Sequence, residues 1–212
     1  MPEITIKYFD IKGRAEPIRL ALTVGGIAFN DDRFQFDEFN EIKESGVLPF
    51  GQVPVMIVDG QVITQSGGIL RYCGKLAGLY PRDDDLLAAR IDEVLGVLDD
   101  VNNFLFTKYQ GKDEEKKKEV RGEFVKSIVP RFMGGLDRLA SKASDGSFIC
   151  GDKMTIADLT LYYSIWNIKS GIVDYVPTDI FDKYTRLMSS YNAVLEHPKV
   201  VEWNRAHPAK KA

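Results

Sequence analysis

The chain has 212 residues and a formal net charge of −3 at pH 7, with 44% hydrophobic and 28% charged residues. That length allows one large domain or two smaller ones, and the charge balance gives no positive field for nucleic acid or an anionic membrane. Only two cysteines and two histidines are present, which argues against a disulfide framework, structural zinc or a histidine-based catalytic triad. The sequence therefore predicts a cytoplasmic protein without a metal site, a membrane span or a signal peptide.

The beginning of the chain predicts a strand, a helix and a second strand. Residues 4–8 alternate apolar and polar side chains, as a half-buried strand does. Apolar residues from Ala15 to Val24 follow helical spacing, Pro17 suits the first turn of that helix, and two glycines end it. Residues 27–34 predict the second strand, and the polar residues 37–52 predict an irregular segment.

A hairpin and a helix follow. Residues 53–64 contain two apolar runs joined by Asp59-Gly60, a strong signal for a tight turn. Residues 65–78 show helical spacing, with Ser66 as the expected N-cap and Gly78 as the stop. The order of these elements predicts an α/β unit with a mixed four-stranded sheet, although pattern alone leaves the strand order open.

The rest of the chain predicts helices. The charged run at 111–123 is typical of a solvated helix start, Pro130 predicts a bend, and Thr155 with Asp158 forms an acidic capping box. Apolar residues follow helical spacing over 87–105, 120–139, 155–168, 179–195 and 198–206. We therefore expect an α/β domain at 1–79, a linker at 80–84 and an all-helical domain at 85–212.

Four local features of the first unit could bind one polar ligand. Tyr8 and Arg14 flank the first strand-to-helix turn, although a strand-end tyrosine is more often a core residue and such an arginine a solvated one. The other three features are the backbone edge of Val53-Pro54, which a cis peptide bond would open, the helix start at Gln65-Ser66, which favours a carboxylate, and Lys43, which could reach a second carboxylate. Each has an ordinary structural explanation when taken alone.

Several stretches match a known family in order and with compatible spacing. They are YFDIKGRAEPIRLAL (8–22), GQVPVMIVDG (51–60), QSGGILRYCGKLAGLYP (65–81), LDD (98–100) and GDKMTIADLTLY (151–162). Together they resemble the cytosolic glutathione transferases, and most of all the sigma-like branch that includes the haematopoietic prostaglandin D synthases. The resemblance implies a thioredoxin-like first domain, an all-helical second domain, a homodimer, and a detoxification enzyme with glutathione as co-substrate.

The resemblance also implies roles for individual residues. Tyr8 would donate a hydrogen bond to the sulfur of glutathione, and Arg14 would support the thiolate electrostatically. Gln52 and Val53, beside a cis Pro54, would hold the cysteinyl backbone. Gln65 and Ser66 would bind the γ-glutamyl carboxylate, and Lys43 would bind the glycyl carboxylate. Asp100 would reach the glutathione of the partner subunit.

Two positions depart from the family pattern. Phe39 occupies a glutathione-binding position where the sigma pattern usually has tryptophan, so a hydrogen bond of about 1.5–3 kcal/mol to the glycyl carboxylate is missing. Gly96 replaces one acid of the metal-sensitive cluster of the prostaglandin synthases and leaves only Asp99 and Asp100. The second change argues against transferring the prostaglandin activity to this chain.

The expected chemistry is conjugation of glutathione to small hydrophobic electrophiles, with Gly13, Asn102 and Phe106 as candidates for the wall of the electrophile site. For Phe106, a place in the ordinary core is the favoured alternative. Thiol–disulfide exchange on the same scaffold needs a cysteine at the first turn, and no cysteine precedes Cys73. A glutathione-dependent isomerase or peroxidase, and a non-catalytic glutathione-binding relative, stay open as alternatives.

Overall fold

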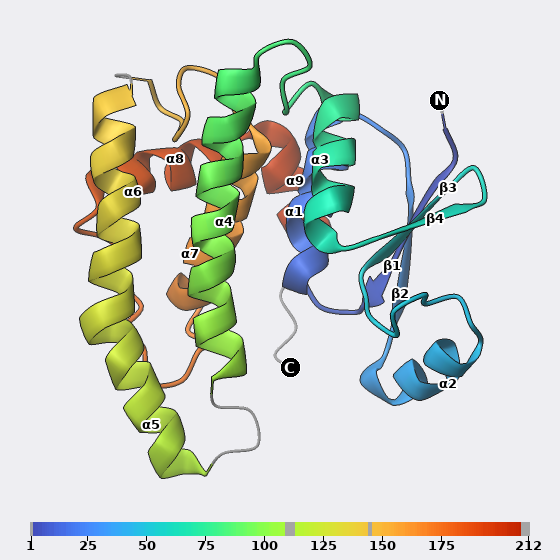
Figure 1. The fold of residues 1–212 in the computed structure, drawn as a ribbon, viewed down its shortest axis with the longest axis horizontal. Coiled ribbons are helices and arrows are strands. Elements are labelled where there is room, and N and C mark those ends of the chain that lie inside the picture. Colours follow the sequence, from blue (N-terminus) through green and yellow to red (C-terminus); the bar gives the residue numbers. More distant parts are fainter. Residues whose placement is uncertain (1, 109–112, 144–145, 209–212) are drawn as a thin grey trace. The chain divides into compact units, whose positions relative to one another are not determined.

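The computed structural model describes residues 2–108, 113–143 and 146–208 (Figure 1). The chain divides into two compact units, Met1–Arg82 with Pro198–Ala212, and Asp83–His197. The first unit combines a sheet with helices and the second is helical, which confirms the predicted fold class. The last helix belongs to the first unit, whereas the sequence analysis expected it in the helical domain at 85–212.

The first unit is built on a four-stranded mixed sheet with the strand order β2-β1-β3-β4. The central strand β1 (Ile4–Phe9) pairs in parallel with β2 (Asn30–Phe34) and antiparallel with β3 (Val55–Val58). The edge strand β4 (Gln61–Thr64) pairs antiparallel with β3 through the predicted turn, where Asp59 and Gly60 adopt φ angles of 48° and 80°. The strands and the hairpin were thus predicted correctly, with β2 beginning three residues later than expected.

Helices α1 (Glu16–Gly25) and α3 (Ser66–Ala77) pack against each other beside the sheet (Figure 1). Their approach is close, because a Cβ atom on Gly25 would lie 2.6 Å from the Cβ of Ala77. The last helix, α9 (Pro198–Ala206), packs on α1.

The segment predicted to be irregular contains a short helix, α2 (Phe39–Glu44), which follows a 3₁₀ turn at Phe36–Glu38. Figure 1 shows α2 apart from the α1–α3 layer. With six residues, α2 is too short to produce a helical period in the sequence.

The second unit consists of α4 (Asp85–Thr107), α5 (Glu114–Glu123), α6 (Val129–Ala143), α7 (Ile156–Lys169) and α8 (Thr185–Leu195). Its core forms where α7 packs on α4 and α8 and where α6 packs on α8. Within the described residues, no helix has both the length and the apolar content needed to cross a membrane.

Two sequence features of the second unit are seen directly. A π-helical segment at Phe124–Ile128 joins α5 to α6 just before Pro130, which is the place where the sequence predicted a bend. The capping box of α7 is confirmed, since the Asp158 carboxylate accepts hydrogen bonds from the backbone N–H and the hydroxyl of Thr155 at 2.8 and 2.9 Å. The predicted apolar stripe of α6 is wrong at Leu139, which is 46% exposed, whereas Leu136 and Ala140 are buried.

Candidate functional site

Tyr8 lies near the carboxyl end of the central strand. Alternation along β1 places it on the same buried face as Ile4 and Ile6, and it is only 7% exposed. Its ring meets that of Phe9 edge to face, with 5.4 Å between the ring centroids. Burial and the contact with Phe9 therefore hold the phenol ring in place, and its hydroxyl faces the turn that follows β1.

That turn brings the backbone of Arg14 to the phenol. The Arg14 N–H donates a hydrogen bond to the Tyr8 hydroxyl oxygen at 3.1 Å. Because the oxygen acts as an acceptor here, the hydroxyl keeps its own proton for another partner. Among the residues that the structure describes, none accepts that proton.

Gly13 makes this approach possible. It has a φ of +50°, and a Cβ atom at this position would lie 2.5 Å from both the Tyr8 hydroxyl oxygen and its Cε1. Only glycine fits there without displacing the phenol or the turn. Gly13, expected to line the electrophile site, therefore lies directly against Tyr8.

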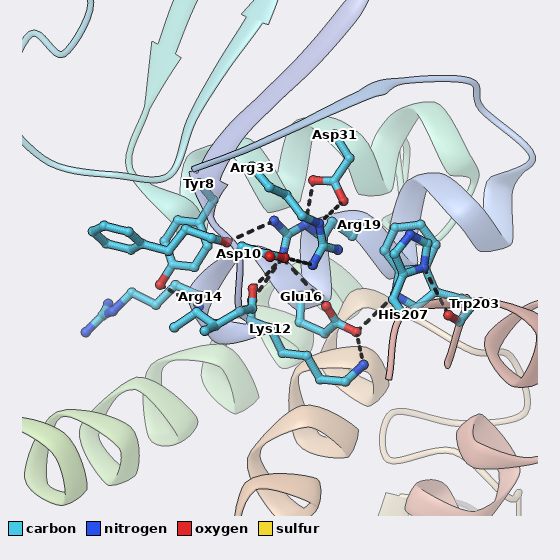
Figure 2. A network of polar contacts seen from close by, with 12 residues as sticks. Tyr8, Asp10, Lys12, Arg14, Glu16, Arg19, Asp31, Arg33, Trp203 and His207 are labelled. Atoms are coloured by element: carbon cyan, nitrogen blue, oxygen red, sulfur yellow. Dashed lines mark hydrogen bonds and ion pairs between the residues drawn. The ribbon is translucent and has the colours of Figure 1, made fainter. Parts of the chain in front are cut away.

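The electrostatics around Tyr8 favour the protonated phenol. Burial raises its pKa above the usual 10.0, and this effect is opposed by the hydrogen bond from Arg14 and by the charges of Arg14 and Arg19. At neutral pH the hydroxyl is therefore a hydrogen-bond donor and not an anion. The Arg14 side chain itself is exposed and points away from the polar network behind the turn (Figure 2).

A buried arginine behind the turn was missed by the sequence analysis. Arg19 is fully buried in α1, and its guanidinium donates to the carbonyl oxygens of Ile11 at 2.7 Å and Lys12 at 3.3 Å (Figure 2). It also forms an ion pair with Asp31 on β2, with 2.8 Å between Nε and Oδ1. The available signal was its place in the apolar run IRLAL (18–22), where a solvated charge is not expected.

Glu16 extends this network to the last helix. Its carboxylate is fully buried and accepts hydrogen bonds from the Lys12 ammonium at 2.6 Å and the Trp203 indole N–H at 3.0 Å. Lys12 also donates to the Asn204 side chain at 3.0 Å. The first turn and the last helix thus both bind the start of α1 through Glu16 and Lys12. These contacts explain why α9 belongs to the first unit.

The sheet register aligns three of the predicted features at one edge. Lys7 on β1 and Thr64 on β4 both pair with Val55, the first residue of β3. The residues just beyond these pairs are therefore neighbours, namely Tyr8, Val53-Pro54 and Gln65. The Val53-Pro54 peptide bond is cis, as the resemblance implied.

Ser66 is not the N-cap of α3, which corrects the sequence prediction. Gln65 takes the cap position with a φ of 65°, and its side chain makes no capping hydrogen bond. Since the Gln65 side chain makes no capping bond, the first N–H groups of this helix suit an external anion. Gln65 is the single residue between β4 and this helix, so it takes the cap position in place of Ser66.

Three further predicted residues lie together beside this helix start. The Gln65 side chain donates to the Gln52 side chain at 3.4 Å. The stem of Lys43 passes Gly51, the neighbour of Gln52, where a Cβ atom would lie 2.9 Å from the Lys43 Cε. The exposed ammonium of Lys43 on α2 and the side-chain amides of Gln52, before β3, and Gln65, after β4, thus lie in one region of the first unit.

Phe39 lies in an aromatic cluster. Its ring centroid is 5.3 Å from that of Phe9 and 6.4 Å from that of Phe34. The Phe39 ring therefore packs on the strand that carries Tyr8, and this side chain offers a ligand no polar atom.

The second unit carries the other predicted residues on α4. Asp100 and Gly96 are exposed, and nothing described lies within 4 Å of a Cβ built on Gly96. The Asn102 amide donates to the Ser164 hydroxyl at 3.2 Å, which ties α4 to α7, and Phe106 is half-buried.

Comparisons with known proteins agree with this architecture. A family model of the glutathione S-transferase N-terminal domain matches residues 4–75, and one of the C-terminal domain matches residues 99–207. Mouse haematopoietic prostaglandin D synthase is 31% identical over 211 residues, covering 100% of both chains. Glutathione S-transferase 4 of Caenorhabditis elegans is 28% identical over 204 residues, covering 94% of each.

Solved structures show the same similarity. Prostaglandin synthase D of Nilaparvata lugens superimposes with a TM-score of 0.86 at 28% identity, covering 99% of this chain and 100% of that one. The glutathione S-transferase of Ascaris lumbricoides gives a TM-score of 0.85 at 27% identity with both chains fully covered. As the sequence resemblance predicted, the chain belongs to the glutathione S-transferase family.

Proposed function

We propose that this chain is a glutathione transferase in which the Tyr8 hydroxyl donates a hydrogen bond to the sulfur of glutathione and stabilises the thiolate. The observation that carries the proposal is the hydrogen bond from the Arg14 N–H to the Tyr8 oxygen. It occupies the acceptor side of the hydroxyl and leaves the proton for sulfur. The raised pKa of Tyr8 supports the same role, since the phenol stays protonated at neutral pH.

The interactions are large enough for the task. A free thiol has a pKa near 8.5, so about two units of lowering are needed to make the thiolate dominant at neutral pH, or roughly 2.7 kcal/mol. One hydrogen bond to a charged group contributes about 1.5–3 kcal/mol. The exposed guanidinium of Arg14 adds a favourable charge, so the two groups together are large enough to supply a shift of this size.

The edge beside Tyr8 suits the remainder of glutathione. The uncapped start of α3, with Gln65 and Ser66, offers N–H groups to the γ-glutamyl carboxylate. Gln52 and the backbone of Val53 would hold the cysteinyl unit, and the exposed ammonium of Lys43 would pair with the glycyl carboxylate. Phe39 contributes only apolar contact, so this last carboxylate has one donor fewer than in the usual sigma pattern.

The second substrate is proposed to be a small hydrophobic electrophile, with Gly13, Asn102 and Phe106 as lining candidates. The thiolate sulfur would attack the electrophilic carbon, form the C–S bond and expel the leaving group with its electron pair.

The family membership also supports a homodimer in which Asp100 of the partner subunit reaches the amino group of glutathione. We further propose a cytoplasmic location, which the two unpaired cysteines support.

A glutathione-dependent isomerase is the second candidate, because several relatives are named prostaglandin D synthases. Gly96 weighs against it, since its exposed position on α4 supplies no carboxylate beside Asp99 and Asp100. Turnover of an aryl halide and of a peroxide, compared at equal glutathione concentration, separates transferase from peroxidase. A prostaglandin endoperoxide would reveal isomerase activity.

Tyr8→Phe tests the proposal, because it removes one oxygen and keeps the ring. We expect glutathione binding to be retained while conjugation of an aryl halide falls by at least about tenfold, equivalent to the loss of about one hydrogen bond. Unchanged conjugation would show that Tyr8 does not activate the sulfur. Loss of both binding and conjugation in a folded variant would instead assign Tyr8 to substrate binding. Undetectable activity in the unmodified protein would favour the non-catalytic relative.

A further inference from the structure

The segment between Tyr8 and Gly13 is held from behind by a single side chain. The Arg19 guanidinium contacts three carbonyl oxygens of this segment, those of Phe9 at 3.5 Å, Ile11 at 2.7 Å and Lys12 at 3.3 Å. These carbonyls belong to consecutive or nearly consecutive residues that leave the strand and enter the turn. One rigid, planar fork thus fixes the path of the chain from the phenol to the residue that contacts it.

The same guanidinium lies close to the phenol. Its Cζ atom is 5.7 Å from the centroid of the Tyr8 ring, within the range of a cation–π contact. Arg19 is fully buried, so its position is set by packing and not by solvent. It therefore lies within cation–π range of the Tyr8 ring and also holds the turn whose backbone donates to the Tyr8 hydroxyl.

We propose that Arg19 is a positioning residue for Tyr8, which aims the Arg14 N–H at the phenol oxygen and so keeps the hydroxyl proton directed at sulfur. The inference rests on the proposed function, since it concerns the orientation of the group that activates glutathione. Arg19 itself contacts no reacting atom in this scheme. Its effect passes through the backbone of residues 9–14.

The surroundings of Arg19 indicate that it acts on Tyr8 by holding the backbone of the turn more than by its positive charge. Three charged groups face it, namely Asp31 at 2.8 Å, Glu16 at 3.9 Å and Arg33, which shares Asp31. The two carboxylates compensate most of its charge. In agreement, the charge of Arg19 is the weakest of the influences that lower the pKa of Tyr8.

Arg19→Lys separates the two contributions, because lysine keeps the charge and loses the planar fork. A single ammonium cannot hold three carbonyls together with the Asp31 carboxylate. Arg121→Lys is the matched control, since Arg121 is only 2% exposed and also donates to a carbonyl, that of Leu105, in the second unit. Both variants lose a buried guanidinium, and only one of them touches the turn.

The readout is the pKa of the thiol of bound glutathione, followed by the ultraviolet absorbance of the thiolate, together with kcat and KM as functions of pH. For Arg19→Lys we expect the thiol pKa to rise by about one unit and kcat at neutral pH to fall about tenfold, as for a misplaced catalytic group. The KM for glutathione should change less than about twofold, because the carboxylate contacts are untouched. Arg121→Lys should keep the thiol pKa of the unmodified protein.

A second pair of variants decides the matter if Arg19→Lys does not fold. Asp31→Asn leaves Arg19 in place and removes its ion-pair partner, while Asp32→Asn removes the neighbouring carboxylate, which pairs with Lys7. A raised thiol pKa in Asp31→Asn but not in Asp32→Asn supports the proposal. An unchanged thiol pKa in a folded Arg19→Lys protein, or in Asp31→Asn where only that variant folds, overturns it.

The variants distinguish failure of the positioning role of Arg19 from failure of the activation by Tyr8. If Tyr8→Phe raises the thiol pKa and Arg19→Lys does not, the positioning role is refuted and the role of Tyr8 stands. If Tyr8→Phe leaves the thiol pKa unchanged, the proposed activation by Tyr8 is itself refuted. A thiol pKa that rises equally in Arg19→Lys and Arg121→Lys would show a general loss of rigidity and would also overturn the positioning role.

Discussion

Replacing Gly13 with alanine tests the contact between the turn and the phenol. The new Cβ atom would lie 2.5 Å from the Tyr8 hydroxyl oxygen, whereas ordinary contacts begin near 3.4 Å, so about 1 Å of displacement is required. A shift of about 1 Å in a catalytic group can lower the rate about a hundredfold, or about 2.7 kcal/mol in the barrier. The φ of +50° adds a folding penalty of about 1–2 kcal/mol.

The matched control is Gly60→Ala in the hairpin turn. Gly60 also has a positive φ, 80°, but nothing described lies within 4 Å of its built Cβ atom. Both variants should lose the stability that a positive φ costs, Gly13→Ala should lose more in urea unfolding because its Cβ displaces the buried phenol, and only Gly13→Ala should lose about two orders of magnitude in kcat/KM for conjugation. If Gly13→Ala conjugates glutathione as fast as Gly60→Ala, the close approach to Tyr8 is irrelevant to activity and the account of the turn is wrong.

Three further predictions concern other parts of the molecule. Trp203→Phe removes the indole donor to buried Glu16 and should lower the free energy of unfolding by about 1.5–3 kcal/mol, measured in urea; an unchanged midpoint would mean that the contact with α9 is unimportant for stability. Burial raises the pKa of Cys150 from 9.0 to about 12, so its thiolate fraction at neutral pH is about a thousandfold lower than in an ordinary thiol, and iodoacetamide should label it correspondingly slowly, with a rate that rises up to strongly alkaline pH. Labelling of the folded protein at the rate of a free thiol would contradict this. Asp100→Asn should weaken glutathione binding measured by calorimetry if the partner subunit's Asp100 reaches the ligand, and an unchanged affinity would remove that role.

Local patterns predicted most of the elements, because each depends on residues close together in the chain. The alternation of Ile4, Ile6 and Tyr8 gave β1, and Asp59-Gly60 gave the hairpin with the positive φ angles that such a turn needs. The sequence resemblance added the cis bond before Pro54, which no local pattern could have decided.

The parts that could not be predicted depend on contacts between distant residues. The apolar run around Arg19 hints at burial, but its partners, Asp31 twelve positions away and three carbonyl oxygens, are known only from the fold. The assignment of α9 to the first unit depends on Trp203 and Asn204 meeting Glu16 and Lys12, which are separated from them by almost the whole chain. No periodicity in the sequence carries that information.

Gly13 and Ser66 show how a correct motif can leave the geometry undetermined. The motif places a glycine after the strand, but only the φ of +50° and the distance to Tyr8 show that the glycine makes room for the phenol. A serine at the start of a helix is normally its cap, but here the helix begins one residue earlier than a serine cap requires, because Gln65 adopts a left-handed φ. In both cases the deciding quantity is a backbone angle.

In the proposed mechanism, one buried phenol makes the charge on sulfur favourable near neutral pH. The most direct measurement is a titration of bound glutathione by ultraviolet difference absorbance, in the unmodified protein and in Tyr8→Phe. We expect a thiol pKa about two units below the free value of about 8.5 in the unmodified protein, and a return toward the free value in the variant. A bound thiol that titrates like free glutathione in the unmodified protein would contradict the account.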